Sequence, residues 1–324
     1  MRLLRDYRDI PDEFSGGVFA LGNFDGLHRG HRALIHAANE AARARGVASG
    51  VLTFEPHPRR VFQPDAPPFR LTPFRSKVRL LRHLQVDVAA CLRFNEALYS
   101  KPAETFIEDV LIGGLKVSGV VVGYDFVFGH RRSGHVDLLR ETGATRGFDV
   151  TVVSPVAYGD DVCSSTTIRV NLQSGRVRRA AELLGHCWEV EGRVRGGDRR
   201  GRTIGFPTAN LHLRRQGLTP TLGVYAVWFG LVGADGATRW HPGVANLGTR
   251  PTFNGTGVVL ESHLFDFDQD IYGRLARVAF VEFLRPERKF DGFEALKAQI
   301  AADRDQARAL LQRPENAHET LVLP

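Results

Sequence analysis

The sequence has little cysteine, little lysine and no long apolar run. Its three cysteines, Cys91, Cys163 and Cys187, are odd in number and widely spaced, which argues against both a disulfide framework and a zinc site. No apolar run approaches the ~20 residues of a membrane helix, and the first residues lack the apolar core of a signal peptide. We therefore expect a cytoplasmic protein without membrane contact.

The chain is basic although lysine is scarce. Only 5 of the 43 Lys and Arg residues are lysine, and the formal net charge is +7. The planar guanidinium suits phosphate recognition, so this charge is compatible with phosphorylated small molecules or with nucleic acid. The arginines are scattered and rarely alternate with aromatic residues, so we expect most of them to be solvated, and the net charge supports phosphorylated small molecules at least as well as nucleic acid.

The 324 residues are enough for two domains, and the hydrophobic pattern changes near residue 185. Before it, apolar runs alternate with helical patterns, which predicts an α/β domain with a parallel sheet over residues 1–185. After it, short β-like runs precede one amphipathic segment, which predicts a small antiparallel β-barrel followed by a long helix over residues 186–324. The expected strands are 18–21, 48–54, 86–92, 117–122, 150–153, 188–195, 223–231, 241–247, 258–264 and 275–284; the expected helices are 29–45, 73–84, 103–112, 136–142, 166–173, 177–184 and 293–311.

A glycine-rich segment with paired histidines follows the first expected strand. It reads Gly22-Asn-Phe24-Asp25-Gly-Leu-His28-Arg-Gly-His31 and runs into the predicted helix 29–45. Ligands of open α/β sheets bind beyond the carboxyl ends of strands, and a helix N-terminus offers N–H groups and a positive dipole to phosphate. Histidines three residues apart share one helix face, so both imidazoles can bond to phosphate oxygens. A capping role is the alternative for a single histidine.

A hydroxyl-rich segment, Ser164-Ser165-Thr166-Thr167-Ile-Arg169, ends the first half. Alone, such a run is more often a helix cap. Together the two segments resemble the His-x-Gly-His and Ile-Ser-Ser-Thr-x-x-Arg motifs of the nucleotidyltransferase superfamily, with Cys163 in place of isoleucine. The resemblance implies a Rossmann-like domain with His28 and His31 as catalytic residues, and nucleotide-binding residues Gly22, Phe24, Asp25, Ser164, Ser165, Thr166 and Arg169.

Two aromatic segments are similar to flavin-side segments of prokaryotic FAD synthetases. The first runs from Thr53 to Phe62 and the second from Gly123 to Gly129, where Val127 replaces the family's usual arginine. Their phenylalanines offer the flat apolar surface that an isoalloxazine ring needs, with core packing as the alternative. The implied flavin-binding residues are Phe54, His57, Phe62, Asp125, Phe126 and Phe128.

The segment 192–211 resembles the riboflavin kinase signature, since it contains Gly-Arg-Thr-Ile-Gly-Phe-Pro-Thr-Ala-Asn. A loop rich in glycine and arginine can wrap phosphates. Thr208 and Asn210 occupy alternate positions of an extended segment, so their oxygen atoms can bind Mg²⁺ from one side. The resemblance implies nucleotide binding by Gly197, Arg200, Gly201, Arg202, Phe206 and Pro207.

Glu261 is the predicted catalytic carboxylate of the second half. The run Leu260-Glu261-Ser-His263-Leu264 is similar to the family segment that carries the catalytic glutamate. Its alternation puts Glu261 and His263 on one face of a strand and the two leucines on the other. Residues 285–293 match the family's flavin-side flap, which implies flavin binding by Arg285, Glu287 and Phe290.

The resemblance covers about residues 18–310 and identifies the chain as a member of the prokaryotic bifunctional riboflavin kinase/FAD synthetase family. It implies ATP-dependent phosphorylation of riboflavin to FMN by residues 186–324 and adenylylation of FMN to FAD by residues 1–185, with Mg²⁺. The expected partners are these small molecules rather than nucleic acid, and self-association stays open. The alternatives are a nucleotidyltransferase acting on a nicotinamide, pantetheine or cytidyl substrate, and a nucleic-acid-binding protein.

Overall fold

The computed structural model describes residues 1–196, 208–213, 217–252 and 255–318. The chain forms two compact units. The first contains Met1–Pro67 and Phe74–Cys163, and the second contains Pro68–Pro73 and Ser164–Pro324. The chain therefore leaves the first unit after Pro67 and re-enters it at Phe74; we call Pro68–Pro73 the strap.

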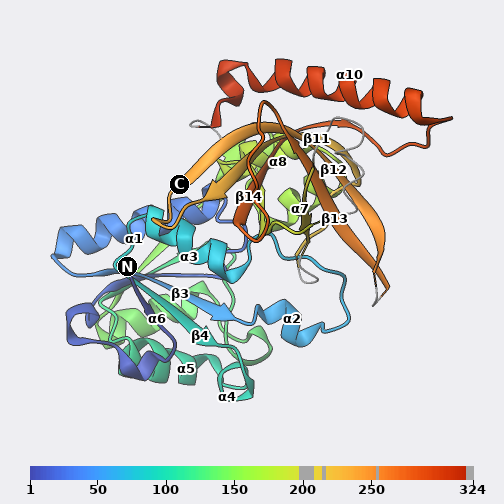
Figure 1. The fold of residues 1–324 in the computed structure, drawn as a ribbon. Helices are drawn as coiled ribbons and strands as arrows, with labels where there is room; N and C mark the ends of the chain where they lie inside the picture. Colours follow the sequence, from blue (N-terminus) through green and yellow to red (C-terminus); the bar gives the residue numbers. More distant parts are fainter. Residues whose placement is uncertain (197–207, 214–216, 253–254, 319–324) are drawn as a thin grey trace. The chain divides into compact units, whose positions relative to one another are not determined.

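The first unit is built on a six-stranded parallel sheet in the order β1-β4-β3-β2-β5-β6 (Figure 1). The sheet strands are β1 (Arg2–Leu4), β2 (Val18–Leu21), β3 (Ser49–Glu55), β4 (Val88–Arg93), β5 (Gly119–Gly123) and β6 (Asp149–Val153). From β2 the chain proceeds outward through β3 to β4, whereas β5 and β6 lie on the other side of β2. This reversal makes the carboxyl ends of β2 and β5 the topological switch point of the sheet.

Helices cover both faces of this sheet (Figure 1). They are α1 (Arg29–Arg45), α2 (Pro58–Phe62), α3 (Phe74–His83), α4 (Glu96–Tyr99), α5 (Ala103–Phe106), a π-helical segment (Ile107–Gly114) and α6 (Val136–Arg146), with 3-10 turns at Tyr7–Asp9, Asp12–Phe14 and His130–Arg132. Helix α1 packs on β2, β3 and β5 through its buried apolar residues. The opposite sheet face forms a core with α4, α5, α6 and the π-helical segment. A hairpin of β7 (Ala157–Tyr158) and β8 (Asp161–Val162) precedes Cys163.

The second unit is a nearly closed antiparallel barrel in the order β10-β13-β12-β11-β14-β9. Its strands are β9 (Glu189–Arg193), β10 (Ala209–His212), β11 (Gly223–Val232), β12 (Thr238–Thr252), β13 (Gly255–Leu264) and β14 (Leu275–Arg285). Just beyond β9, the Arg195 N–H donates to the Asn210 carbonyl at 2.9 Å, which joins the two edge strands. Over the described strands, this contact brings the two edges of the sheet together, and a closed edge protects a sheet from aggregation.

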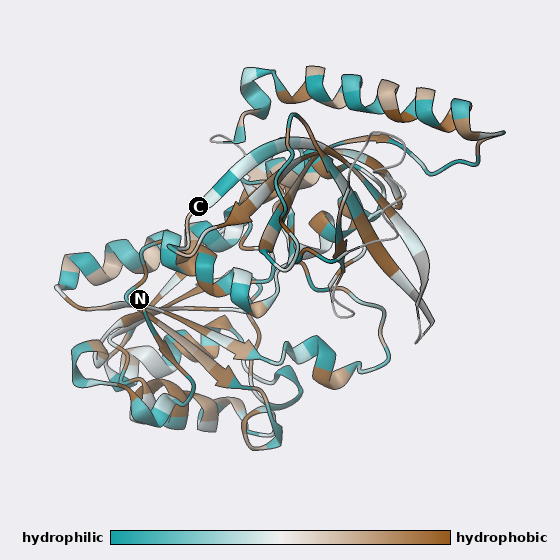
Figure 2. Cartoon of the chain, viewed as in Figure 1, coloured by the Kyte–Doolittle hydropathy of each residue, from teal (hydrophilic) through white to brown (hydrophobic). Residues whose placement is uncertain are grey.

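The helices of the second unit are α7 (Ser165–Gln173), α8 (Val177–Leu184) and α10 (Phe293–Leu311), followed by a 3-10 turn (Pro314–Asn316). Helix α10 packs on β11, β12 and β14. Its Ala307 and Leu311 join Val224, Ala226 and Val244 of the barrel in one apolar cluster. Figure 2 shows the alternation of hydrophilic and hydrophobic residues along α10, as its amphipathic sequence predicts.

The predicted fold class is confirmed, and so is nearly every expected element. The helix expected at 103–112 is an α-helical turn that continues as a π-helix. The short elements β1, α2 and α4 were not predicted, because three to five residues carry too little periodicity. Whether the two activities divide at residue 185 stays a prediction, since compact units are defined by contacts and not by activity. In the described part of the chain, no helix has the length and apolarity needed to cross a membrane.

Candidate active sites

The segment with the paired histidines lies at the switch point of the parallel sheet. Gly22 directly follows β2, and its N–H donates to the Leu52 carbonyl of β3 at 3.1 Å. The chain then turns sharply, with positive φ at Phe24 (50°), Gly26 (92°) and Leu27 (45°). Left-handed backbone at non-glycine residues is uncommon and is often found where a loop is shaped for function.

A buried lysine that sequence analysis missed holds this turn. The Lys77 ammonium on α3 donates to the Asn23 carbonyl at 2.6 Å, and the Thr53 hydroxyl donates to the same oxygen at 3.2 Å. Lys77 is 1% exposed, while Phe24 and Asp25, which follow Asn23, are also buried. The only sequence signal for Lys77 is a charged residue on the core side of an amphipathic helix.

His28 and His31 lie together at the N-terminus of α1. Their rings stack with centroids 3.6 Å apart, and the His28 Nδ1 accepts from the His31 N–H at 3.3 Å. His28 is thus the N-cap of the helix, and it also faces the end where the dipole favours anions. Gly30 permits this arrangement, since an added Cβ would lie 3.1 Å from the His28 Nδ1 and 3.2 Å from the Cys163 carbonyl. The two imidazoles therefore share one face, as their spacing predicts.

The same helix end carries two arginines. Burial, followed by the charge of Arg29, lowers the pKa of the Arg32 guanidinium. Arg29 lies over the Tyr158 ring of the β7–β8 hairpin, with its guanidinium carbon 4.9 Å from the ring centroid. The positive potential that these side chains add to the helix dipole favours a polyanion such as a triphosphate.

The hydroxyl-rich segment belongs to the second unit, where it begins α7. Ser164 is the N-cap: its Oγ accepts from the Thr167 N–H at 3.1 Å. Ser165 and Thr166 open the first turn, so their N–H groups belong to the end of the helix that attracts anions. Arg169 donates from Nε to the Phe69 carbonyl of the strap at 2.8 Å. The capping role and the predicted phosphate-binding role of this segment are compatible.

Four aromatic rings gather at the carboxyl ends of β3 and β4. Phe94 makes edge contacts with both Phe54 and Phe62 at 5.6 Å between centroids, and Tyr99 lies 5.2 Å from Phe62. Phe62 is 61% exposed, so the cluster presents an aromatic face to solvent. Phe94 and Tyr99 were missed because nothing in the sequence pairs them with the predicted phenylalanines.

The other predicted flavin residues lie in three settings. Phe126 stacks on Phe128 at 5.6 Å, and Phe128 is buried in the core against Phe106. Asp125 is exposed beside Gly123 at the end of β5. His57 is buried and caps α2 by accepting from the Arg59 N–H at 3.1 Å. Among these residues, Phe126 and Asp125 have the exposure that a ligand contact needs, whereas Phe128 packs as a core residue.

The barrel aligns three polar side chains across neighbouring strands. In the registers of β13 with β10 and β12, Glu261 stands opposite both Asn210 and Asn246. Directly opposed residues of antiparallel strands have Cβ atoms ~5 Å apart, so their side chains meet on one face. Leu260, Ser262 and Leu264 are buried on the other face, as the alternation predicts. Asn246 was missed, although it is the one polar residue in the apolar run from Gly243 to Leu247.

The predicted magnesium ligands fit the row of side chains formed by Asn210, Glu261 and Asn246. Asn210 is buried beside Glu261, and Thr208 stands two residues earlier on the same side of the extended chain. An amide oxygen, a hydroxyl and a carboxylate are oxygen donors of the type that Mg²⁺ prefers. Gly197, Arg200, Gly201, Arg202, Phe206 and Pro207 lie outside the described residues.

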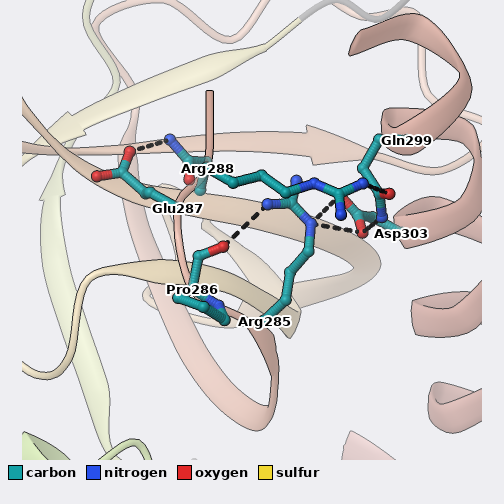
Figure 3. Close-up of polar contacts among 7 residues, drawn as sticks. Arg285, Pro286, Glu287, Arg288, Gln299 and Asp303 are labelled. Atoms are coloured by element: carbon teal, nitrogen blue, oxygen red, sulfur yellow. Dashed lines mark hydrogen bonds and ion pairs between the residues drawn. The ribbon is translucent and has the colours of Figure 1, made fainter. Parts of the chain in front are cut away.

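The predicted flavin-side flap connects the row to α10. The Asn246 amide donates to Glu287 at 3.2 Å, which places that carboxylate near Gly248. Arg285 forms a bidentate pair with Asp303 of α10, with contacts of 2.7–3.1 Å, and Arg288 bonds Gln299 of the same helix (Figure 3). Phe290 lies under both guanidiniums, at 5.7 and 4.9 Å. The Arg285 guanidinium therefore anchors α10, and Glu287 is the flap residue that reaches the row.

A pocket of the second unit is lined by other residues than these predicted ones. It separates the strap from β9 and β10, and Arg70, Trp188, Glu191 and His212 are among its lining residues. Glu261, Asn210 and Arg169 do not line it. Within the described residues, no group of three His, Cys, Asp or Glu side chains is arranged to hold a metal ion.

Comparison with known proteins matches each half to a family. Residues 10–167 match the FAD synthetase model and residues 184–311 match the riboflavin kinase model. The chain is 43% identical over 311 residues to the bifunctional riboflavin kinase/FMN adenylyltransferase of Escherichia coli K12, which covers 95% of this chain and 97% of that one. The chain belongs to the bifunctional riboflavin kinase/FMN adenylyltransferase family. The resemblance stated from the sequence is thus confirmed.

Another member of this family and a solved structure are also similar to this chain over nearly its full length. The Pseudomonas fluorescens enzyme is 42% identical, with 96% of this chain and 98% of that one covered. A crystal structure titled as a macrolide-efflux protein from Streptococcus pneumoniae superposes with a TM-score of 0.84 at 32% identity, over 94% of this chain and 98% of that one. The two-unit architecture is therefore shared along nearly the full length.

Proposed function

We propose that this chain makes FAD from riboflavin in two steps that use different residues. Residues 186–324 phosphorylate riboflavin to FMN with ATP, and residues 1–185 adenylylate FMN. Family membership supports both activities. The observation that carries the assignment of residues is the register that aligns Asn210, Glu261 and Asn246 on one barrel face.

In the first step Glu261 acts as the general base. It accepts the proton of the terminal ribityl hydroxyl while that oxygen bonds the γ-phosphorus of ATP and the bond to the ADP oxygen breaks. An alcohol is a poor nucleophile at neutral pH, so this proton acceptor is needed. Thr208 and Asn210 would hold Mg²⁺, which neutralises phosphate charge when bound. Asn246 orients Glu287 toward the same face.

The second step needs no base. The phosphate of FMN has a second pKa near ~6 and is largely dianionic at neutral pH, so its oxygen attacks the α-phosphorus of ATP directly and pyrophosphate leaves. His28 and His31 would donate hydrogen bonds to the phosphate oxygens, whose charge increases in the transition state. The N–H groups of Ser165 and Thr166 and the fork of Arg169 would hold the β- and γ-phosphates. We propose the Phe54–Phe62–Phe94–Tyr99 face as the surface for the isoalloxazine ring.

The remaining partner assignments follow from this chemistry. ATP, riboflavin and FMN are the partners, and we propose that the chain acts in the cytoplasm, where these metabolites are made and used. Nucleic acid and membranes have no part in either step. A different adenylyl acceptor is the alternative; conversion of riboflavin to flavin products with ATP, separated by chromatography, decides it.

The function is tested by two reciprocal substitutions in the full chain. Glu261→Gln keeps the shape of the side chain and removes the base, so FMN formation should fall about 10²–10⁴-fold. FAD formation from supplied FMN should persist, because the second step uses no carboxylate. The measurement is chromatographic separation of the flavins after incubation with either riboflavin or FMN.

His31→Ala should give the opposite pattern. FMN should accumulate from riboflavin at the rate of the unmodified chain, while FAD formation falls about 10²–10³-fold, as for loss of a transition-state donor. A folded Glu261→Gln variant that loses both activities would refute the proposed division. Normal FAD yield from His31→Ala would refute the role of the paired histidines.

A further inference from the structure

The strap is bound by hydrogen bonds along its whole length. Each of four consecutive carbonyls accepts a donor: Phe69 from Arg169 Nε, Arg70 from the Leu218 N–H at 2.8 Å, Leu71 from Trp188 Nε1 at 2.9 Å, and Thr72 from Arg70 Nε at 3.2 Å. The side chains of these four strap residues are buried. The strap is part of the connection between α2 and α3, residues 63–73, and such a connection has no need of these contacts, since connections normally run over the surface.

Two of the donors belong to the barrel half of the sequence. Trp188 precedes β9 and is 4% exposed, with its ring packed on Phe280 of β14 at 5.2 Å. Leu218 precedes β11 and continues a short bridge between Gly217 and Arg70. These contacts fix the strap rigidly to the barrel of the second unit.

The third donor is the arginine of the Ser-Ser-Thr-x-x-Arg segment. The Arg169 guanidinium bonds the Phe69 carbonyl through Nε and lies over the Phe69 ring, with its carbon 5.4 Å from the centroid. The Nε–H is one of five donors of the planar fork, so this bond restrains the plane of the group through one of them. A long side chain is thereby restrained on two sides before any ligand binds.

We infer that Phe69 and Trp188 are positioning residues for FMN adenylylation, which act by holding Arg169 in the orientation that receives the ATP phosphates. The inference rests on the proposed function of Arg169. Trp188 fixes the strap to the barrel, and Phe69 transmits that position to the guanidinium. Two residues outside the motif itself, one of them in the kinase half of the sequence, thus set ATP affinity in the adenylylation step.

The test compares two matched tryptophan substitutions. Trp188→Phe removes the donor to Leu71 and retains an aromatic ring in the core. Trp228→Phe, the control, removes an equivalent bond on the same barrel, from Trp228 Nε1 to the Asn316 carbonyl at 2.8 Å. For Trp188→Phe we expect the ATP KM of FMN adenylylation to rise about fivefold, as for one lost hydrogen bond, with kcat unchanged. Trp228→Phe should leave that KM unchanged.

A second variant covers the possibility that Trp188→Phe does not fold. Phe69→Leu keeps the backbone carbonyl and most of the apolar volume but removes the ring beneath Arg169, so the same KM should rise. In both variants the ATP KM of riboflavin phosphorylation should stay as in the unmodified chain. A merely structural loss would lower the amount of active protein, and therefore kcat, at constant KM.

Arg169→Ala separates failure of this inference from failure of the proposed function. If Arg169→Ala lowers adenylylation while Trp188→Phe and Phe69→Leu leave its ATP KM unchanged, the positioning role is wrong and the function of Arg169 stands. If Arg169→Ala itself has no effect on adenylylation, the proposed function of Arg169 is wrong. Non-additive KM effects of Phe69→Leu and Arg169→Ala in the double variant would support the inference, and additive effects would overturn it.

Discussion

Gly30 lies between the His28 ring and the Cys163 carbonyl, and both are close enough to crowd any side chain there. An alanine Cβ would lie 3.1 Å from the His28 Nδ1 and 3.2 Å from the carbonyl oxygen. Alanine is ordinarily favoured over glycine in a helix by ~1 kcal/mol. At this position the preference is opposed by contacts that only a shift of the histidine ring or the Cys163 backbone relieves.

Gly30→Ala should therefore impair adenylylation without unfolding the protein. We expect kcat/KM for FAD formation from FMN to fall about tenfold, because a small displacement of a catalytic group is costly. The change in the free energy of unfolding should stay within about 1 kcal/mol. Riboflavin phosphorylation in the same variant is the internal control, and an unaltered rate of FAD formation would show that the His28 position is not critical.

His241 of β12 is a half-buried imidazole in the barrel. Burial, then the charges of Arg239 and Arg274, lowers its pKa from 6.5. The unfolded chain therefore binds a proton at this residue more readily than the folded chain does. Its contribution to stability is present above pH 6.5 and is lost as the pH falls through the folded pKa.

The free energy of unfolding should accordingly decline as the pH is lowered from 6.5. Denaturant titrations at a series of pH values should show that the free energy of unfolding changes less steeply with pH in this range for His241→Gln than for the unmodified chain. Equal slopes near pH 6 in the unmodified chain and in the His241→Gln variant would contradict the assignment of this pH dependence to His241.

The pair of Asp266 and Arg308 provides a second effect of pH on stability, at a lower pH. The hydrogen bond from Arg308 lowers the pKa of Asp266 from 3.8, so its contribution is lost only in stronger acid.

Helix α10 is joined to the barrel by two aspartate–arginine pairs of very different exposure. Asp303 and Arg285 are 5% and 18% exposed in their side chains, whereas Asp266 and Arg308 are 78% and 39% exposed. Removing one partner of a buried pair leaves an uncompensated charge, whereas exposed pairs contribute little. Asp303→Ala should thus lower the free energy of unfolding by about 3 kcal/mol.

Asp266→Ala is the matched control, with the same substitution in an exposed pair that joins the turn after β13 to Arg308 of the same helix. It should be clearly less destabilising than Asp303→Ala when both are measured by chemical denaturation. Asp303 holds Arg285, which precedes Glu287 by only two residues. Loss of this pair should therefore displace Glu287, and Asp303→Ala should also raise the riboflavin KM of the kinase step. Equal losses of stability in the two variants would show that the buried pair is not the anchor of α10.

The elements that sequence analysis predicted are those with a helical pattern over at least two turns or with an apolar run of at least four residues. Helix α1 and strands β11, β13 and β14 satisfy this condition, and their bounds agree closely with the expected ranges. The strap could not be predicted, because its contacts are backbone carbonyls that accept from distant donors and leave no periodic signal. Lys77 and Asn246 were missed for a related reason: their significance lies in which strand or loop they face.

Motif spacing predicted more of the candidate sites than of their surroundings. The stacking of His28 and His31 follows from a three-residue interval at a helix start, and the side of Glu261 follows from alternation along a strand. The neighbours of Glu261 depend on the register of β13 with β10 and β12, which one sequence does not reveal. The anchoring of Arg285 by Asp303 depends on the packing of α10 in the same way.

At the scale of the whole molecule, the net charge is +7, and many of the arginines are paired locally with carboxylates. Arg43 with Glu40, Arg45 with Asp149 and Arg146 with Glu108 are exposed examples. Arginines paired in this way do not contribute to a continuous basic stripe of the kind that polynucleotide binding uses. The charge is better explained by composition and by the phosphate-rich substrates.

We therefore expect no polynucleotide binding at about 0.15 M salt, where non-specific contacts are strongly weakened. Fluorescence anisotropy with labelled single- and double-stranded DNA at increasing salt measures this directly. Any retention at low salt should fall steeply as salt is added. Tight binding that persists at physiological salt would restore the nucleic-acid alternative.

The partition of the chain in space does not follow its order in sequence. Residues 68–73 are encoded inside the region that matches FAD synthetases, yet they are seated among residues from the region that matches riboflavin kinases. A chimaeric protein that joins residues 1–185 of one relative to the remaining residues of another would combine the strap of the first parent with the barrel contacts of the second. When the halves are exchanged between relatives, in the laboratory or in evolution, the strap should therefore come from the same parent as the barrel.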